Sequence, residues 1–360
     1  MIRPIRTAVS IALSATVLAI TACTSDTPSA QQAGAAKADK VTVVAYDSFT
    51  PSKEVLAAFT KQTGIAVEIV TAGDTGELVN KAVLTRDDPL GDVLYGVDTT
   101  FFSRAVGEGL FEPYAATGLD RVDPAFTALV PAHQVTPVDY GDVCINYDKA
   151  ALAAKGVTAP VTLADLGDPK YKDLLVVENP ATSSPGLAFV LASIAKFGEQ
   201  GWQDYWKGLR SNGVKVVSGW DEAWNTEFTA GEGKGSRPIV VSYASSPPVA
   251  VLYGPDPKAT ESPIGVSEAT CFRQVEFVGV LRKAKHPAAA RAFVDFTIGS
   301  SFQEDLPLSM FVFPVRTGTR LPELFTRFAV TPAEPLTLSP QQIAQHRERW
   351  IDQWTATVLS

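Results

Sequence analysis

Hydroxyl side chains gather where a predicted strand passes into a predicted helix. Residues 182–186, Thr-Ser-Ser-Pro-Gly, follow an apolar run and open a helical segment. Hydroxyls and backbone N–H groups at a helix N-terminus suit an anionic or polar ligand group, because that terminus carries partial positive charge. Capping of the helix by a single hydroxyl explains the same pattern, so both interpretations stay open.

Two further loops after predicted strands combine an aromatic ring with hydroxyls. Trp220 lies at a strand-to-helix turn, and Tyr243 begins the segment Tyr-Ala-Ser-Ser at residues 243–246. Asp47 and Asp74 supply carboxylates after strands in an earlier part of the chain. Aromatic faces attract cations by roughly 0.5–2 kcal/mol each. These residue types together predict a site for a flat, cationic and partly polar ligand.

Motifs for covalent or metal chemistry are missing from the sequence. There is no G-x-S-x-G, no H-E-x-x-H and no G-x-x-x-x-G-K-[ST]. Residues 193–196 match S-x-x-K, but they lie in an apolar helical run without the companion motifs. The three histidines, His133, His286 and His346, share no local spacing. We therefore predict no catalytic residue, no bound metal and no cofactor.

Strands and helices must alternate to place these loops together. Each predicted strand is short and apolar, and each predicted helix has apolar residues at helical spacing. The predicted strands are 41–45, 65–70, 93–98, 174–177, 214–217, 239–243 and 274–281, and the main helices are 52–63, 187–197 and 288–298. This alternation predicts an α/β fold of two lobes, each a mostly parallel sheet flanked by helices. We expect the chain to cross between the lobes near 139–143 and 267–274.

Four tryptophans form pairs at i,i+4 spacing on amphipathic helices, and core packing is the better interpretation for them. They are Trp202 with Trp206, and Trp350 with Trp354. Trp224 lies on the same predicted helical face as Trp220 and fits a core position equally well.

The first residues have the pattern of an export signal. Arg3 and Arg6 precede 13 apolar or small residues, Ala8 to Ile20, a stretch too short to span a bilayer comfortably. The segment ends in Ile-Thr-Ala before Cys23, which resembles the lipobox of bacterial lipoproteins. This resemblance implies removal of residues 1–22 and acylation of Cys23. An ordinary secretory signal, with Cys23 incidental, is the alternative.

Composition narrows the choice of partners and of compartment. The chain carries 31 basic and 39 acidic residues, and removal of two arginines with the signal raises the acidic surplus from 8 to 10 charges. Nucleic acid is excluded as a partner because it needs a basic surface. Outside the cytoplasm, Cys144 and Cys271 are expected to form a disulfide. Two buried free thiols are the alternative.

Short motifs in register along residues 41–358 resemble the thiamine-binding proteins of bacterial ABC importers. Those motifs are Tyr46-Asp47-Ser48-Phe49, the Asp74 loop before Asn80, Val97-Asp98, Asp139-Tyr140-Gly141, Asn179 to Gly186, Gly219-Trp220-x-Glu222-Ala223, Ser242-Tyr243-x-Ser245-Ser246-Pro247, Phe313-Pro314-Val315, and Ser339-Pro340 through Arg347, Trp350, Ile351 and Trp354.

The resemblance implies a two-lobed (type II) periplasmic-binding-protein fold that closes on thiamine or its phosphates and then docks on a membrane ABC permease. It assigns ligand contacts by position. These are Asp74 and Thr75 from the first lobe, Ser183 and Ser184 at a phosphate-accommodating end, Trp220, Tyr243, Ala244, Ser245 and Ser246 along the cleft, and Tyr46 and Asp47 as weaker additions. We expect a monomeric receptor that is tethered to the membrane through lipid on Cys23.

Two positions depart from the family pattern. Ala181 stands where the family can place an arginine, and Met310-Phe311-Val312-Phe313 stands where a tryptophan can occur. Both leave the choice among thiamine, its monophosphate and its diphosphate open. A binding protein for ferric ion or a polyamine, and a secreted enzyme on the same fold, remain alternatives.

The predicted boundaries follow from these assignments. They are a signal peptide at 1–22, a flexible tether at 23–40, the first part of lobe 1 at 41–140, lobe 2 at 141–268, a return to lobe 1 at 269–330 and a helical C-terminal segment at 331–360.

Overall fold

Residues 39–231 and 235–360 are described in the computed structural model of the chain. The predicted signal peptide, Cys23 and all but the last two residues of the predicted tether lie outside this part.

The described strands form one nine-stranded mixed sheet, and its order along the sheet is β2-β1-β3-β8-β4-β7-β5-β6, with β9 beside β4. The strands are β1 (Lys40–Ala45), β2 (Ala66–Thr71), β3 (Val93–Asp98), β4 (Thr136–Asp148), β5 (Leu175–Glu178), β6 (Lys215–Val217), β7 (Ile239–Tyr243), β8 (Ile264–Val280) and β9 (Phe313–Pro314). The outer strands pair in parallel on each side, β2-β1-β3 and β7-β5-β6. The long strands β4 and β8 join the two sides through antiparallel pairing.

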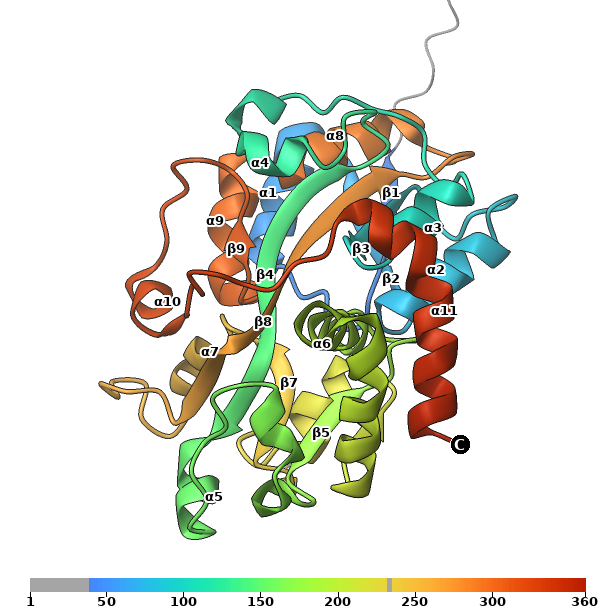
Figure 1. Ribbon diagram of the computed structural model, residues 1–360. Coiled ribbons are helices and arrows are strands. Elements are labelled where there is room, and N and C mark those ends of the chain that lie inside the picture. Colours follow the sequence, from blue (N-terminus) through green and yellow to red (C-terminus); the bar gives the residue numbers. More distant parts are fainter. Residues whose placement is uncertain (1–38, 232–234) are drawn as a thin grey trace, which may run out of the picture. The chain divides into compact units, whose positions relative to one another are not determined.

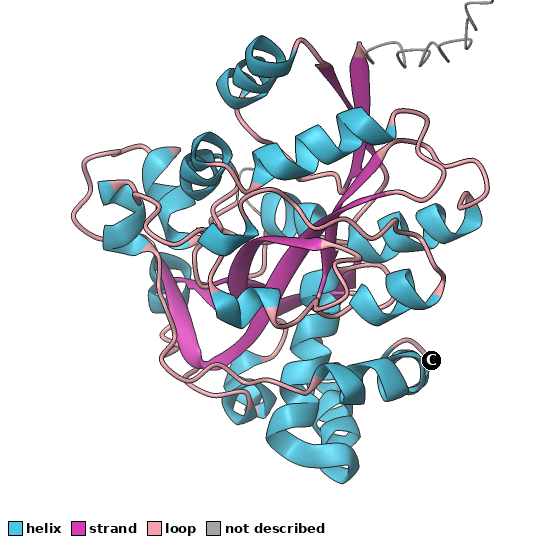
Figure 2. Ribbon diagram, turned by 90° about the horizontal axis from the view of Figure 1, so that it is seen from above, coloured by secondary structure: helices cyan, strands magenta, loops and turns pink. Residues whose placement is uncertain are grey.

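Helices cover the faces of this sheet (Figures 1 and 2). They are α1 (Lys53–Thr63), α2 (Thr75–Leu84), α3 (Phe102–Gly107), α4 (Pro124–Thr127), α5 (Lys149–Ala154), α6 (Ser184–Ser211), α7 (Pro247–Leu252), α8 (Pro287–Thr297), α9 (Ser300–Ser309), α10 (Glu323–Phe328) and α11 (Pro340–Val358). Short 3-10 turns occur at Leu119–Arg121, Ala164–Gly167 and Pro169–Tyr171, and a π-helical segment, η4, at Glu222–Glu227.

The predicted two-lobed α/β fold is confirmed. We call the side of β2-β1-β3 the first lobe and the side of β7-β5-β6 the second lobe. Figure 1 shows β4 and β8 running through the middle of the molecule from one lobe to the other. Strand β8 extends beyond the predicted segment 274–281, and β4 is not among the predicted strands. The residue boundaries proposed for the lobes stay predictions.

Helix α6 crosses the centre of the fold because its first half is apolar on every side. Residues 187–194 are all buried, as expected for a helix surrounded by protein. Gly198 has non-helical backbone angles and separates this half from an amphipathic second half. Trp206 there donates from Nε1 to the buried Ser193 Oγ (2.9 Å). Ser193 of the S-x-x-K match is therefore a core residue, whereas Lys196 is exposed.

The C-terminal helix α11 packs against α6 through tryptophan contacts. The rings of Trp206 and Trp354 meet edge to face with centroids 5.4 Å apart. Trp202 and Trp350 are equally buried, so the prediction that all four are core residues is confirmed.

Cys144 of β4 and Cys271 of β8 lie at an irregularity in the pairing of the two long strands. Val143 pairs with Phe272 and Ile145 with Ser267, so the residues between Ser267 and Phe272 have no regular partners there. The structure joins the two sulfur atoms by a disulfide (2.00 Å). The bond therefore links the two strands where they pass between the lobes.

We expect the mature protein, denatured without reductant, to show no alkylation at Cys144 and Cys271 in intact-mass measurement. Prior reduction should add two alkyl groups, which provides the internal control. The bond closes a loop of more than 100 residues, and such a cross-link stabilises by about 2–5 kcal/mol, so reduction should also lower the melting temperature. Two alkyl groups without prior reduction would reject the bond.

Candidate binding site

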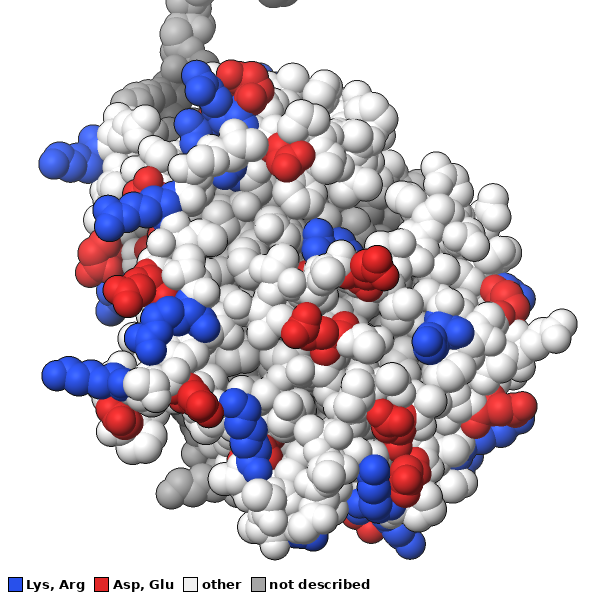
Figure 3. Space-filling view, turned by 60° about the vertical axis from the view of Figure 1, so that its left-hand side comes forward, with Lys and Arg blue, Asp and Glu red and all other residues white. Residues whose placement is uncertain are grey.

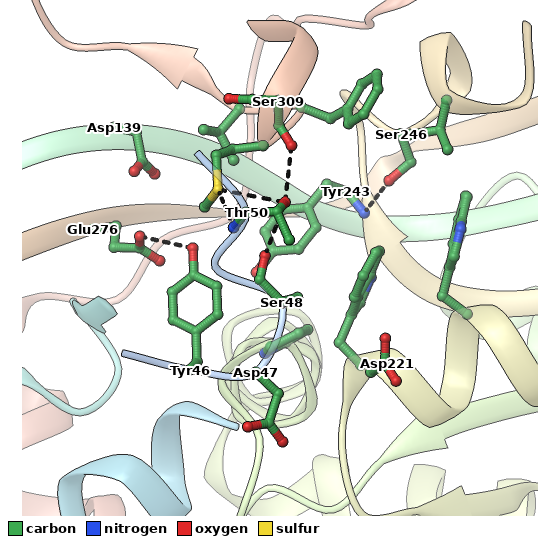
Figure 4. A pocket seen from close by; sticks show the side chains of 18 of the residues that line it. Tyr46, Asp47, Ser48, Thr50, Asp139, Asp221, Tyr243, Ser246, Glu276 and Ser309 are labelled. Carbon is green, nitrogen blue, oxygen red and sulfur yellow. Dashed lines mark hydrogen bonds between the residues drawn. The ribbon is translucent and has the colours of Figure 1, made fainter. Parts of the chain in front are cut away.

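A cavity of about 600 Å³ opens between the two lobes, and residues from both contribute to its walls (Figure 4). It is lined by Tyr46, Asp47, Ser48, Thr50, Ser52, Asp74, Thr75, Asp139, Gly141, Pro185, Trp220, Asp221, Trp224, Asn225, Tyr243, Ser246, Val249, Tyr253, Gln274, Glu276, Leu308, Ser309, Met310, Phe311 and Val312. This volume suits a small organic molecule of two linked rings.

Aromatic side chains of the second lobe form one wall. The rings of Trp220 and Trp224 stack with centroids 5.6 Å apart and an interplanar angle of 14°. Trp224 belongs to η4, and Trp220 lies two residues before the start of this segment. Trp220 Nε1 donates to Ser242 Oγ (2.8 Å), which holds the indole in orientation.

Tyr243 reaches the cavity because β4 has a glycine beside it. A Cβ atom on Gly141 would lie 2.9 Å from the Tyr243 ring. Burial raises the pKa of Tyr243 well above its ordinary value, so the ring stays neutral. Tyr243 therefore offers the ligand a neutral aromatic face rather than a charge.

Asp74 connects the two lobes at one end of the cavity. As the N-cap of α2 it accepts from Thr75 N through Oδ1 (2.6 Å), and through Oδ2 it accepts from Trp220 N (3.0 Å). Burial raises the pKa of this carboxyl, while these hydrogen bonds oppose the rise. The sequence placed Asp74 and Trp220 in one site, and the structure brings them into direct contact.

The contact continues along the backbone. Gly76 N donates to Thr182 O (2.8 Å), and a Cβ on Gly76 would lie 2.6 Å from Ala181 O. Only glycine allows α2 to approach the second lobe this closely. The lobes therefore meet at this end of the cavity.

The predicted site residues fall into two groups. Those lining the cavity are Tyr46, Asp47, Asp74, Thr75, Trp220, Tyr243 and Ser246. The remaining four, Ser183, Ser184, Ala244 and Ser245, are buried and do not line it. Their direct contact with a ligand stays a prediction.

The buried hydroxyls of the second group serve the protein itself. Ser184 Oγ donates to Asp98 Oδ2 (2.5 Å) and accepts from Gln274 Nε2 (3.1 Å). Ser183 is the N-cap of α6. Ser183 therefore caps a helix, as one interpretation of the hydroxyl run predicted. Ser184 instead forms a hydrogen bond between the two lobes.

Sequence reasoning missed two buried carboxyls as site residues, in addition to the exposed Asp221. Asp139 of β4 and Glu276 of β8 both line the cavity and are almost fully buried. Asp139 belongs to one of the motifs that resemble the family, but it is not among the predicted ligand contacts. Glu276 is in neither set. The available signal was an acidic residue inside an otherwise apolar strand, Val275-Glu276-Phe277. Burying such a group is costly, which makes it a candidate site residue.

All charged side chains that line the cavity are acidic. They are Asp47, Asp74, Asp139, Asp221 and Glu276. No Lys, Arg or His of the described residues lines it. Figure 3 shows that Lys and Arg are interspersed with Asp and Glu over the face of the molecule drawn there. The cavity thus favours a cationic ligand and disfavours an anionic one.

Two structural properties bear on metals and membranes. Residues 39–231 and 235–360 hold no group of three or more His, Cys, Asp or Glu side chains arranged to bind a metal ion. In the same part of the chain, no helix has both the length and the apolar character of a membrane span.

A two-lobed α/β fold with a ligand-sized cavity between its lobes defines a binding protein for small solutes. Residues 88–335 match the model of the bacterial extracellular solute-binding proteins. The chain belongs to this family, whose members are extracytoplasmic solute receptors of transport systems.

Individual relatives extend the comparison over almost the whole chain. The thiamine-binding periplasmic protein of Brucella abortus biovar 1 (strain 9-941) is 29% identical over 327 residues, 88% of this chain and 92% of that protein. Iron uptake protein A1 of Synechocystis sp. (strain ATCC 27184 / PCC 6803 / Kazusa) is 24% identical and covers 82% of this chain and 79% of that protein. The solved structure of a periplasmic thiamin binding protein superposes with a TM-score of 0.77 and 26% identity, over 90% of this chain and 98% of that one.

Proposed function

We propose that the protein is an extracytoplasmic receptor that binds thiamine between its lobes and delivers it to an ABC importer. The observation that carries this proposal is a ligand-sized cavity with stacked tryptophans on one wall and only acidic residues among its charged groups. Thiamine is a permanent cation with two flat rings, so it matches both features. The thiamine-binding relatives support the same ligand.

Unphosphorylated thiamine is the preferred form in this proposal. A phosphate group would bring negative charge into a cavity that, within residues 39–231 and 235–360, is lined by five carboxyls and no basic side chain. Ala181 provides no charge where the family can place an arginine. The hydroxyl of Ser184, which the resemblance assigns to a phosphate, is already bonded to Asp98 and Gln274.

The receptor is tethered to the membrane through lipid on Cys23 and acts as a monomer in this proposal. The lipobox-like Ile-Thr-Ala before Cys23 supports the tether, although that segment lies outside the described residues. Closure of the lobes creates the surface that the permease recognises, and the ligand undergoes no covalent change.

Native mass spectrometry of the protein from its own host tests the ligand class. We expect a co-purified mass equal to thiamine, and calorimetric titration should then give an affinity for thiamine at least tenfold above that for thiamine monophosphate. A co-purified ferric ion, the alternative favoured by the iron-uptake relative, or a polyamine would overturn the proposal. Equal affinity for the monophosphate would overturn only the preference for the unphosphorylated form.

A further inference from the structure

Asp139 and Glu276 lie directly opposite each other on neighbouring antiparallel strands. Their Cα atoms are register partners in the β4–β8 pair. On the other side of β8, Glu276 is the register partner of Asp98 in β3. Asp139 is 3% exposed and Glu276 is 7% exposed, yet both border the cavity. Like charges at facing positions of a sheet destabilise it, so this arrangement needs a specific explanation.

The hydrogen-bond partners of the pair do not supply the missing positive charge. Tyr46 Oη donates to Glu276 Oε1 (3.1 Å), and Tyr95 Oη donates to Asp139 Oδ2 (2.9 Å). Figure 4 shows the bond from Tyr46 to Glu276, with Asp139 nearby on the same side of the pocket. Both donors are neutral phenols, because burial raises the pKa of each tyrosine well above its ordinary value.

Within the described part of the chain, the other titratable groups facing the pair are also neutral or acidic. Tyr243 faces Glu276 from β7, and Asp98 faces both acids from the end of β3. Arg273, three residues before Glu276 in β8, is already paired with Asp142 (2.6 Å). Side chains an odd number of residues apart in a strand point to opposite faces of the sheet. Arg273 therefore points to the face opposite that of Glu276 and does not face the cavity.

Two adjacent buried carboxyls without a cation cannot both be ionised at modest cost. Burial raises the pKa of Asp139 to about 7, and burial together with the Asp139 charge raises the pKa of Glu276 well above its ordinary value. The ligand-free pair therefore retains a proton near neutral pH. A cation in the cavity would replace the positive charge of that proton.

We propose that Asp139 and Glu276 form the cation subsite of the cavity and that the pair releases its shared proton to solvent when a cationic ligand binds. The identity of the ligand as thiamine rests on the function proposed above. The exchange balances in charge, because one positive charge enters the cavity as one proton leaves.

The sign of the pH dependence follows from this exchange. The free protein holds more protons than the complex, so higher pH favours the complex. Affinity rises with pH and falls as the pH drops through the raised pKa of Asp139, because the free pair there takes up a proton that the complex does not hold. For one proton the fall approaches tenfold per pH unit.

Isothermal titration calorimetry of the mature protein with thiamine at pH 6.5 tests the inference, using buffers of different ionisation enthalpy. The slope of observed heat against buffer enthalpy counts the protons released. We expect between about half a proton and one proton for the wild type. In the double variant Asp139→Asn with Glu276→Gln the pair has no proton to release, so proton release should fall to near zero and the pH dependence of the affinity between 5.5 and 7.5 should be lost.

Asp221→Asn is the matched control, because it removes an exposed carboxyl at the same cavity and should leave the proton count unchanged. Titration of the ligand itself is common to all variants and cancels in their comparison. Thiamine binding whose heat is independent of the buffer overturns this inference but leaves the proposed function intact. No binding of thiamine at any pH overturns the proposed function. The wild-type measurement requires no variant to fold.

Discussion

Replacing Trp220 with alanine is expected to weaken thiamine binding at least tenfold. The indole forms the aromatic wall together with Trp224, and it is held in place by its bond to Ser242. A cation over an aromatic face is stabilised by roughly 0.5–2 kcal/mol, or more when water is excluded. A tenfold change in affinity corresponds to about 1.4 kcal/mol, which lies within this range. Calorimetric titration of the purified variant measures the effect.

Stability should change much less than affinity. Trp220 is half-buried, so loss of its stacking and of one hydrogen bond should lower the free energy of unfolding by only about 1 kcal/mol. Trp220→Phe is the control, because it keeps an aromatic face but loses the donor to Ser242, and we expect its affinity to stay within about threefold of the wild type. Unaltered affinity in the alanine variant would remove Trp220 from the site.

Asp74→Ala is expected to weaken binding at least tenfold and to open the ligand-free protein. Its carboxylate is one of the acidic groups of the cavity, and it also accepts from Trp220 N across the lobes. Loss of this bond lowers the population of the closed form, and apparent affinity falls in proportion to that population. Small-angle X-ray scattering of the ligand-free variant should show a larger radius of gyration.

Asp74→Ala removes both the N-cap of α2 and the hydrogen bond between the lobes, so a control must distinguish the two effects. Asp123 provides a matched control, because it caps α4 by accepting from Ala125 N (2.9 Å) and lies outside the cavity. Asp123→Ala should cost about 1 kcal/mol of stability or less, with affinity within twofold of the wild type. If both variants bind thiamine as the wild type does, Asp74 is only a helix cap.

Much of the fold could be predicted because local patterns determine local structure. The apolar run Ile239–Tyr243 is a strand with the predicted bounds, and β1, β2 and β3 differ from their predicted ranges by one residue or less at each end. Parallel strands bring their carboxyl ends to one edge of the sheet, so loops far apart in sequence were expected to meet. Seven of the eleven predicted ligand-binding residues accordingly line the cavity.

The long strands β4 and β8 were harder to predict. Each continues through a pairing irregularity and carries acidic or amide residues among apolar ones, such as Asp139, Gln274 and Glu276. A polar residue in a short window argues against a buried strand. Only the pairing of both strands along their length shows that these segments are continuous.

The sequence alone determined the fold class, the alternation of strands and helices, and which loops lie at the ligand edge. It did so because hydrophobic periodicity specifies the backbone and its buried face within each segment. Tertiary structure decided that Asp74 bonds to Trp220, that Ser184 turns inward to Asp98, and that Asp139 faces Glu276. Register between strands more than 100 residues apart depends on packing across the whole sheet, and no local pattern encodes it.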